Sequence, residues 1–253
     1  DGDDLLVGDE KASTSTSGAD QIFGGAGNDI AISGGFNDRN NNGKYDEGEA
    51  ILTDTGSNIV FMGSGNDLVV GATGAEILGG GSGSDSINGN AGNDTLYGGK
   101  ETDTSENGAD NLDGGAGHDE IYANDGDDNL TGSSGYDTLF GGSGNDSLNG
   151  GDGIDELYSG KGDDVLTGGE NSDTFYFAGA HGQDIILDFT PTEDILFVAN
   201  TITDFQTLES IKSAATATTQ NNNSGILLDT GGGNSIFLAG ITVNDFENAN
   251  VSF

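Results

Sequence analysis

Apolar and polar positions recur with a period of nine residues along the first two thirds of the chain. Seven nonapeptides follow one another without a gap from Gly114 to Tyr176, and four more run from Met62 to Tyr97. Their consensus is GGxGxDxUx, in which U stands for an apolar residue. A fixed period of this kind is typical of solenoids, in which each repeat buries its apolar side only against neighbouring repeats.

The xUx part of each unit predicts a very short β-strand. Side chains alternate across a strand, so the middle residue points away from its two neighbours and into the core. Ala31 lies between Ile30 and Ile32, which leaves the register of that one unit open. Sixteen residues hold the inward position: Leu6, Ile22, Ala31, Val60, Val69, Leu78, Ile87, Leu96, Leu112, Ile121, Leu130, Leu139, Leu148, Leu157, Leu166 and Phe175.

The GGxG part of each unit predicts a tight turn, because glycine adopts positive φ at little cost. Its last glycine is kept in every unit but one, where Asn171 replaces it, and asparagine is the next best residue for this conformation. Three units carry insertions, at about residues 10–16, 36–55 and 101–107, and all three fall within the turn. We therefore expect one uninterrupted solenoid over residues 1–176, followed by a separate region, residues 177–253.

The composition by itself favours disorder. Of 253 residues, 47 are Gly, 44 are Asp or Glu and only 6 are Lys or Arg, so the net charge is −38. Only 32% of the residues are hydrophobic. Mutual repulsion of the carboxylates opposes folding, and a thin core does not offset the entropy that the chain loses on folding. The chain therefore folds alone only if something neutralises its carboxylates.

The same figures exclude several classes of protein. A nucleic-acid-binding protein needs a basic face, and the chain has almost no cations. The longest apolar runs, such as residues 59–62 and 195–198, are too short to form a transmembrane segment. The absence of cysteine excludes disulfides and thiolate metal sites.

The sixth position of the repeat is Asp in fourteen units, with Asn58 and Glu76 as the two departures. Stacked units would bring these carboxylates close together, where like charges repel. Because the chain has too few cations of its own, the counter-charge must come from solution. Carboxylates and turn carbonyls suit a hard divalent cation, and Ca²⁺ tolerates irregular oxygen cages better than Mg²⁺. The predicted ligands are Asp4, Asp20, Asp29, Asp67, Asp85, Asp94, Asp110, Asp119, Asp128, Asp137, Asp146, Asp155, Asp164 and Asp173.

This nonapeptide resembles the repeat of the RTX ("repeats in toxin") proteins, over residues 1–176. The resemblance implies an all-β fold, a right-handed parallel β-roll solenoid with a small β-rich C-terminal cap that contains a short helix. Two successive units would make one coil, with several Ca²⁺ ions held between turns two units apart. Asp119, Asp137, Asp155 and Asp173 would then line one edge, and Asp110, Asp128, Asp146 and Asp164 the other.

Asn58 and Glu76 are two units apart, so they are neighbours on one edge. Asn58 lacks the charge, and Glu76 is one methylene longer than Asp. We expect a missing or altered ion at this point, the alternative being that the site tolerates either residue without loss of metal.

Residues 177–253 resemble the flank that caps the roll in serralysin-like and other type I secreted proteins. The resemblance rests on residues 174–177, 182–189 and 193–195. A capping box at residues 203–206 predicts a short helix, and residues 225–228 with 235–238 predict a hairpin. The ending, from Leu238 to Phe253, resembles the uncleaved C-terminal signal of type I secretion; the alternative is that these apolar residues only complete the cap.

The largest insertion has the spacing of an EF-hand-type calcium loop, with glycine at the sixth loop position. Helical flanks are not evident, so the prediction is the loop without the full hand. The alternative is a solvated loop in a chain rich in Asn and Gly. The predicted ligands are Asp38, Asn40, Asn42, Lys44 through its carbonyl, Asp46 and Glu49.

No catalytic motif is evident, and we expect no enzyme activity in this chain. The two histidines, His118 and His181, do not form HExxH, and neither a serine elbow nor a cysteine nucleophile is present. The chain opens in mid-repeat without a signal peptide, so we expect it to be part of a larger protein.

The resemblance implies a module that folds on calcium after export by type I secretion machinery, to the outside of a Gram-negative-type bacterium. One alternative is an adhesin or surface-layer segment, for which the cell envelope or other copies of the chain would be partners. Another is the C-terminal part of an RTX protease, lipase or epimerase whose catalytic domain lies elsewhere.

Overall fold

The computed structural model describes residues 2–8, 19–34, 55–99, 108–199, 215–220, 223–247 and 249–252. The predicted insertions lie outside these residues, apart from residue 55. The chain separates into two units, Asp1–Asp125 and Gly126–Phe253.

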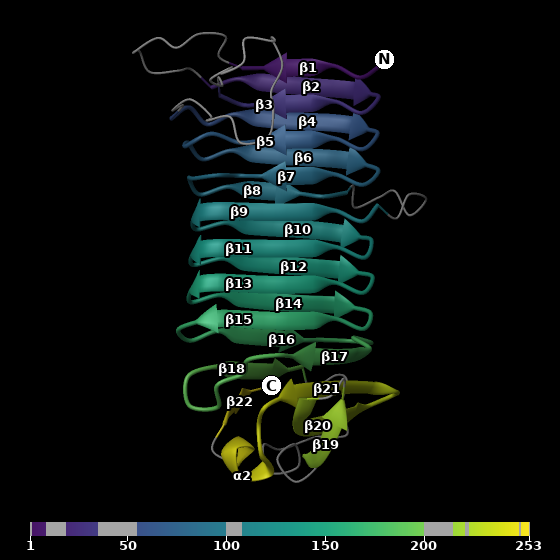
Figure 1. Ribbon diagram of the computed structural model, residues 1–253, viewed down its shortest axis with the longest axis vertical. Coiled ribbons are helices and arrows are strands. Elements are labelled where there is room, and N and C mark those ends of the chain that lie inside the picture. Colours follow the sequence, from purple (N-terminus) through teal and green to yellow (C-terminus); the bar gives the residue numbers. More distant parts are fainter. Residues whose placement is uncertain are drawn as a thin grey trace. The chain divides into compact units, whose positions relative to one another are not determined.

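The first unit consists of two parallel sheets, and successive strands alternate between them (Figure 1). Two nonapeptides therefore make one coil. One sheet has the order β1 (Leu5–Val7), β3 (Ile30–Ile32), β5 (Leu68–Val70), β7 (Ser86–Asn88) and β9 (Asn111–Gly117). The other has the order β2 (Gln21–Ala26), β4 (Ile59–Ser64), β6 (Ile77–Ser82), β8 (Thr95–Tyr97) and β10 (Glu120–Asp125).

The second unit begins in the same way and ends in an antiparallel segment. One sheet has the order β11 (Asn129–Gly135), β13 (Ser147–Gly153), β15 (Val165–Glu170), β17 (Gln183–Ile186), β21 (Asn234–Ala239), β20 (Asn223–Gly231) and β19 (Thr216–Gln220). The other has the order β12 (Thr138–Ser143), β14 (Glu156–Lys161), β16 (Thr174–Phe177), β18 (Ile195–Val198) and β22 (Asn250–Ser252). The all-β parallel roll predicted from the repeat is thus confirmed.

The core consists of the residues predicted to point inward. From Ile22 to Phe175 they are all buried, and Leu6 is half-buried. The open question at Ala31 is settled, because Ala31 pairs with Leu6 and Val69 in the sheet and is fully buried. Each coil therefore adds one apolar side chain from each sheet to the core.

The turns need positive φ, as the glycines predict. Asn171 has φ 82°, in agreement with its place in the repeat. At Gly162 φ is 135°, and an added Cβ would collide with the carbonyl of Gly144 in the neighbouring coil. The coils therefore stack backbone against backbone at this position, which leaves no room for a side chain.

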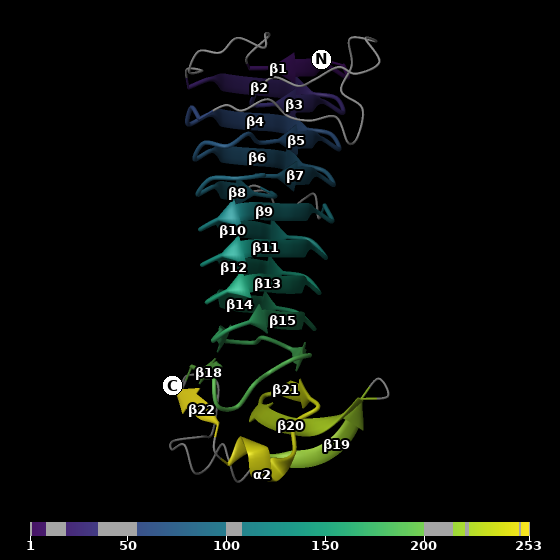
Figure 2. The same ribbon diagram turned by 60° about the vertical axis from the view of Figure 1, so that its left-hand side comes forward.

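The region after residue 176 contains the predicted hairpin. Strands β20 and β21 are antiparallel, with Leu228 opposite Ile236, and β19 pairs with the far edge of β20 (Figure 2). The helix predicted at residues 203–206 lies outside the described residues. A different one-turn helix, α2 (Val243–Phe246), begins at a capping box formed by Thr242 and Asp245. No helix among the described residues is long and apolar enough to cross a membrane.

The parallel pairing itself continues past residue 176. Strand β17 pairs in parallel with β15, and β18 with β16. The division into residues 1–176 and 177–253 stays a prediction.

Candidate metal sites in the turns

Hydrogen bonds connect the sixth residues of the repeats, from the backbone amide of one to the side-chain carboxylate of the next on the same edge. In the second unit the amide of Asp128 donates to Oδ1 of Asp146 at 2.9 Å, and the amide of Asp146 donates to Oδ1 of Asp164 at 2.8 Å. On the other side, the amide of Asp137 donates to Oδ1 of Asp155 at 2.9 Å. Each aspartate thus holds the coil before it through one carboxylate oxygen.

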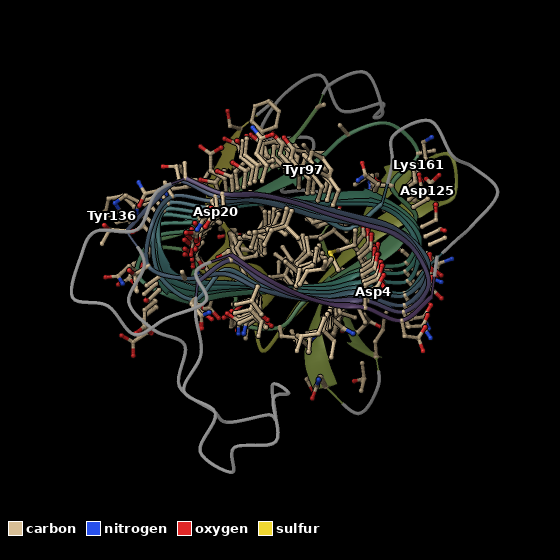
Figure 3. The ribbon with its side chains drawn as sticks, turned by 90° about the horizontal axis from the view of Figure 1, so that it is seen from above. Asp4, Asp20, Tyr97, Asp125, Tyr136 and Lys161 are labelled. Atoms are coloured by element: carbon tan, nitrogen blue, oxygen red, sulfur yellow. The ribbon has the colours of Figure 1, made fainter. Side chains whose placement is uncertain are left out.

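We call these two series the odd and even ladders, after the strands that their members precede. The first unit has the same arrangement, with amide-to-Oδ1 distances of 2.7 to 2.8 Å. In Figure 3, Asp4 and Asp20 lie at opposite ends of the flattened coil, on either side of the apolar side chains. The odd ladder contains Asp4, Asp29, Asp67, Asp85 and Asp110 in the first unit and Asp128, Asp146 and Asp164 in the second. The even ladder contains Asp20, Asn58, Glu76, Asp94 and Asp119 in the first unit and Asp137, Asp155 and Asp173 in the second.

The second carboxylate oxygen is the reason to look for a cation. The ladder aspartates from Asp29 to Asp173 are at most 3% exposed, so water does not solvate them freely. A buried acceptor without a donor costs free energy of about 1–3 kcal/mol, and more if it is charged. Among the described residues, Oδ2 is buried without a hydrogen-bond donor in Asp29, Asp67, Asp85, Asp94, Asp146, Asp155, Asp164 and Asp173.

A backbone carbonyl oxygen of the next coil lies near the second carboxylate oxygen of the ladder aspartate, on the side of the turn's first glycine. An ideal Cβ built on Gly132 would lie 2.6 Å from Asp137 Oδ2 and 2.6 Å from the carbonyl oxygen of Gly150. At Gly24, the same construction gives 2.6 Å to Asp29 Oδ2 and 2.8 Å to the carbonyl oxygen of Met62. The first glycine of the turn thus leaves a cradle lined by acceptor oxygens, which fits a hard divalent cation such as Ca²⁺.

Side chains alone do not complete such a site. Within the described ranges, no three acidic or histidine side chains come together as a metal-binding group. Apart from the coil of Asn58, each coil contributes one carboxylate to each ladder, so the remaining ligands would have to be backbone carbonyls. Turn carbonyls and carboxylates are the mixture that Ca²⁺ accepts in proteins.

Burial and mutual repulsion disfavour the charged form of these aspartates. Burial, opposed by the backbone hydrogen bond and reinforced by the charge of Asp128, raises the pKa of Asp146 to about 7. Burial and neighbouring carboxylates likewise raise the pKa of Asp173 to about 7 and that of Asp164 to about 8. At neutral pH the folded ladders therefore need either protons or a bound cation.

The two departures from Asp behave differently. Oδ1 of Asn58 accepts a hydrogen bond from the backbone amide of Asp20 at 2.8 Å, so the Asn58 side chain makes the same hydrogen bond as an aspartate but carries no charge. Glu76 bends back into its own turn, where Oε2 accepts the amide of Ala72 at 3.3 Å. Burial, with the neighbouring charge of Asp94, raises the pKa of Glu76 to about 8. A missing or altered ion at this point stays a prediction.

Two further residues continue the ladders past the last repeat recognised in the sequence. The amide of Asp164 donates to Oδ1 of Asp184 at 3.0 Å, and the amide of Asp173 donates to Oδ1 of Asp194 at 3.0 Å. Both residues keep the second half of the motif, with an inward apolar residue two positions later, Ile186 and Leu196. That half-motif was the signal in the sequence, and before Asp184 the first and last glycines of the turn, Gly179 and Gly182, are present as well.

The predicted loop site lies outside the described residues. Its ligands were Asp38, Asn40, Asn42, Lys44, Asp46 and Glu49, and none is among the residues that the structure describes.

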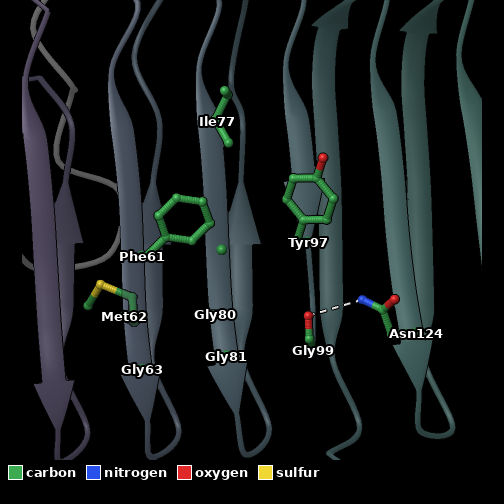
Figure 4. A pocket seen from close by; sticks show the side chains of 10 residues that line it. Phe61, Met62, Gly63, Ile77, Gly80, Gly81, Tyr97, Gly99 and Asn124 are labelled. Carbon is green, nitrogen blue, oxygen red and sulfur yellow. Dashed lines mark hydrogen bonds between the residues drawn. The ribbon is translucent and has the colours of Figure 1, made fainter. Parts of the chain in front are cut away.

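A hollow of about 480 Å³ opens on the outer face of β4, β6 and β8 (Figure 4). It lies between the rings of Phe61 and Tyr97, where the ninth position of the intervening repeat is Gly79. Other units carry an aromatic ring at this position, as in the stacked pair Tyr97 and Tyr122, whose centroids are 5.2 Å apart. No acidic side chain lines the hollow, so it is a missing ring in a stack rather than a metal site.

The chain was compared with protein families, with solved structures and with curated proteins. A family profile described as the RTX calcium-binding nonapeptide repeat matches in four copies, at residues 13–39, 70–105, 104–139 and 140–175, which together cover more than half of the chain. Among solved structures, the extracellular lipase LipA from Serratia marcescens is similar over 80% of this chain, with 20% sequence identity and a TM-score of 0.42. The chain spans 45% of that lipase's length. None of the curated proteins matches.

Proposed function

The chain belongs to the RTX calcium-binding nonapeptide repeat family, and we propose that it is the calcium-dependent folding and secretion module of a larger exported protein. The observation that carries the proposal is the set of buried aspartate oxygens that have no donor within the described protein. Oxygen acceptors in such a cradle are stable in charged form only with a cation beside them. We assign the ladder aspartates from Asp4 to Asp173 as the calcium ligands.

The charge of the chain gives the module its dependence on compartment. In a calcium-poor cytosol, a net charge of −38 keeps the chain expanded, which suits passage through a narrow export channel. Calcium, when bound, supplies the positive charge that the chain lacks. Because only the folded ladders present the buried oxygens, external calcium stabilises the folded state by mass action. The proposed site of action is therefore extracellular.

The C-terminal region has a separate role in the proposal. Residues 177–253 would cap the roll and carry the type I secretion signal, and the segment 38–49 would bind an additional calcium. A solenoid propagates order from neighbour to neighbour, so a capped end provides a starting point for folding. Deletion of residues 177–253 is therefore expected to raise the calcium concentration needed for folding. An unchanged calcium midpoint in the truncated chain contradicts the role of the cap.

Direct measurement of bound metal tests the function itself. We expect the chain, dialysed against calcium, to retain several Ca²⁺ ions per molecule, and an excess of Mg²⁺ to displace few of them. The reason is that Mg²⁺ demands near-octahedral geometry, whereas the turns offer irregular sets of oxygen ligands. Retention of no calcium, or equal retention of both metals, contradicts the proposal.

A further inference from the structure

Within the described part of the chain, the second carboxylate oxygen of the last residue of each ladder has a hydrogen-bond donor, unlike that of the ladder residue directly before it. We call each ladder residue a rung. We infer that at the last rung of each ladder a hydrogen-bond donor of the cap occupies the place that calcium takes at the earlier rungs. The calcium columns then stop at Asp164 and Asp173, and Asp184 and Asp194 bind no ion. This inference rests on the proposed calcium-binding function and defines which carboxylates take part in it.

The odd ladder ends at a buried histidine. Oδ1 of Asp184 accepts the amide of Asp164 like any other rung, but Oδ2 lies 2.5 Å from Nδ1 of His181. The other ring nitrogen, Nε2, lies 2.9 Å from the hydroxyl of Thr230. His181 is fully buried and Asp184 is almost so, which makes a proton on Nδ1 the natural donor to the carboxylate.

The hairpin of the cap places these groups. Strand β21 pairs in parallel with β17, and β20 pairs with β21. The register of β20 shifts between Asp229 and Gly231, a bulge that contains Thr230, and bulges of this kind re-aim a side chain. Thr230 is buried and its hydroxyl contacts the imidazole of His181. The hairpin therefore holds the imidazole in position at the end of the odd ladder, where the next coil would otherwise lie.

The even ladder ends at a backbone amide. Oδ1 of Asp194 accepts the amide of Asp173 at 3.0 Å, and Oδ2 accepts the amide of Thr190 at 2.6 Å. The residues 190–194 form a turn that brings the amide onto the carboxylate. No metal is needed to satisfy this pair of oxygens.

The contrast between neighbouring rungs carries the inference. Asp164 and Asp173 each have a buried Oδ2 without a donor among the described residues, whereas the next rungs, Asp184 and Asp194, have a donor for both oxygens. Two unrelated segments of the cap provide these donors on the two ladders. The last coil is therefore complete without calcium and offers a preformed surface for the rungs that require it.

Calcium stoichiometry at saturation tests the assignment with matched variants. Asp184→Asn and Asp194→Asn keep the size of the side chain and the Oδ1 acceptor, and we expect both to bind as many ions as the parent chain. Asp164→Asn and Asp173→Asn are the controls, and each is expected to lose at least one ion. Loss of an ion in Asp184→Asn or Asp194→Asn overturns the inference, whereas a parent chain that binds no calcium overturns the proposed function instead.

Histidine NMR keeps the inference falsifiable if a cap variant fails to fold. The chain has only two histidines, and His118 lies in an exposed repeat turn, so it serves as the internal control. In the calcium-saturated parent we expect the Nδ1 proton of His181 to resist exchange with water, and the ring protons of His118 to exchange rapidly. An Nδ1 of His181 without a proton, or with exchange as fast as in His118, overturns the assignment of the histidine as the closing donor.

Discussion

Acidification should replace part of the effect of calcium. In the folded chain, burial and the charge of neighbouring aspartates raise the pKa of Asp146 and of Asp173 from the ordinary value of 3.8 to about 7. A folded state with raised carboxyl pKa values binds more protons than the unfolded chain between about pH 4 and pH 7. The stability of the calcium-free fold therefore increases as the pH falls through this window and is lost as the pH rises.

The size of the effect follows from the shift. On going from about pH 8 to about pH 5, a carboxyl with a folded pKa near 7 gains about 3 kcal/mol of folding free energy. Asp164, with a pKa of about 8, belongs to the same ladder as Asp146 and is expected to gain at least as much. The raised pKa of Asp164 depends in part on the charge of Asp146, so the two gains do not add in full, but one of them is already a sizeable part of a domain's total stability of about 5–15 kcal/mol.

The assay is far-UV circular dichroism together with hydrodynamic radius, in chelator, at a series of pH values from about 8 to about 5. This range stays above the isoelectric point of about 4.1, so the chain remains negatively charged and soluble. We expect an expanded chain at the high end and a more compact chain with β-structure at the low end. A chain that remains fully expanded at the low end, or that loses structure on acidification, refutes the reasoning about the buried carboxylates.

Three substitutions test other parts of the account. Asp146→Ala should raise the calcium concentration at the folding midpoint, while His118→Ala, also in a turn but not a predicted ligand, should leave it unchanged; equal midpoints contradict the ligand assignment. Gly162→Ala should lower stability in saturating calcium by about 1–3 kcal/mol in urea unfolding, more than Gly179→Ala, where φ is also positive but nothing lies within 4 Å of the added Cβ. Gly79→Tyr should lower the urea midpoint, because its Cβ would lie 2.5 Å from Cδ1 of the Phe61 ring; a higher midpoint shows that Phe61 turns aside and the stack accepts a further ring.

The repeat made most of the fold predictable from the sequence. Its period predicts one short strand per unit, and an inward residue such as Val60 or Leu157 is recognisable because it is the only apolar residue with a fixed place in each unit. The hairpin of β20 and β21 was equally visible as two apolar runs around a glycine-rich turn. These features depend on local pattern alone.

The ends of the ladders depend on contacts that no local pattern contains. Asp194 has no glycine turn in front of it, and residues 177–178 move the glycines before Asp184 (Gly179 and Gly182) out of the nine-residue frame that ends at Tyr176. The contact of His181 with Thr230 joins residues 49 positions apart, and only the folded hairpin brings them together. Likewise the bend of Glu76 into its own turn follows from one extra methylene in a space sized for Asp.

The central claim is that calcium provides the charge that the buried ladders require. The most direct measurement is a calcium titration that begins in chelator at neutral pH and is monitored by far-UV circular dichroism and hydrodynamic radius. The same titration is then repeated with magnesium. The account predicts a cooperative change from an expanded coil to a compact β-structure with calcium and little change with magnesium. A chain that is already compact and rich in β-structure in chelator contradicts it, because the ladders would then be stable without a cation.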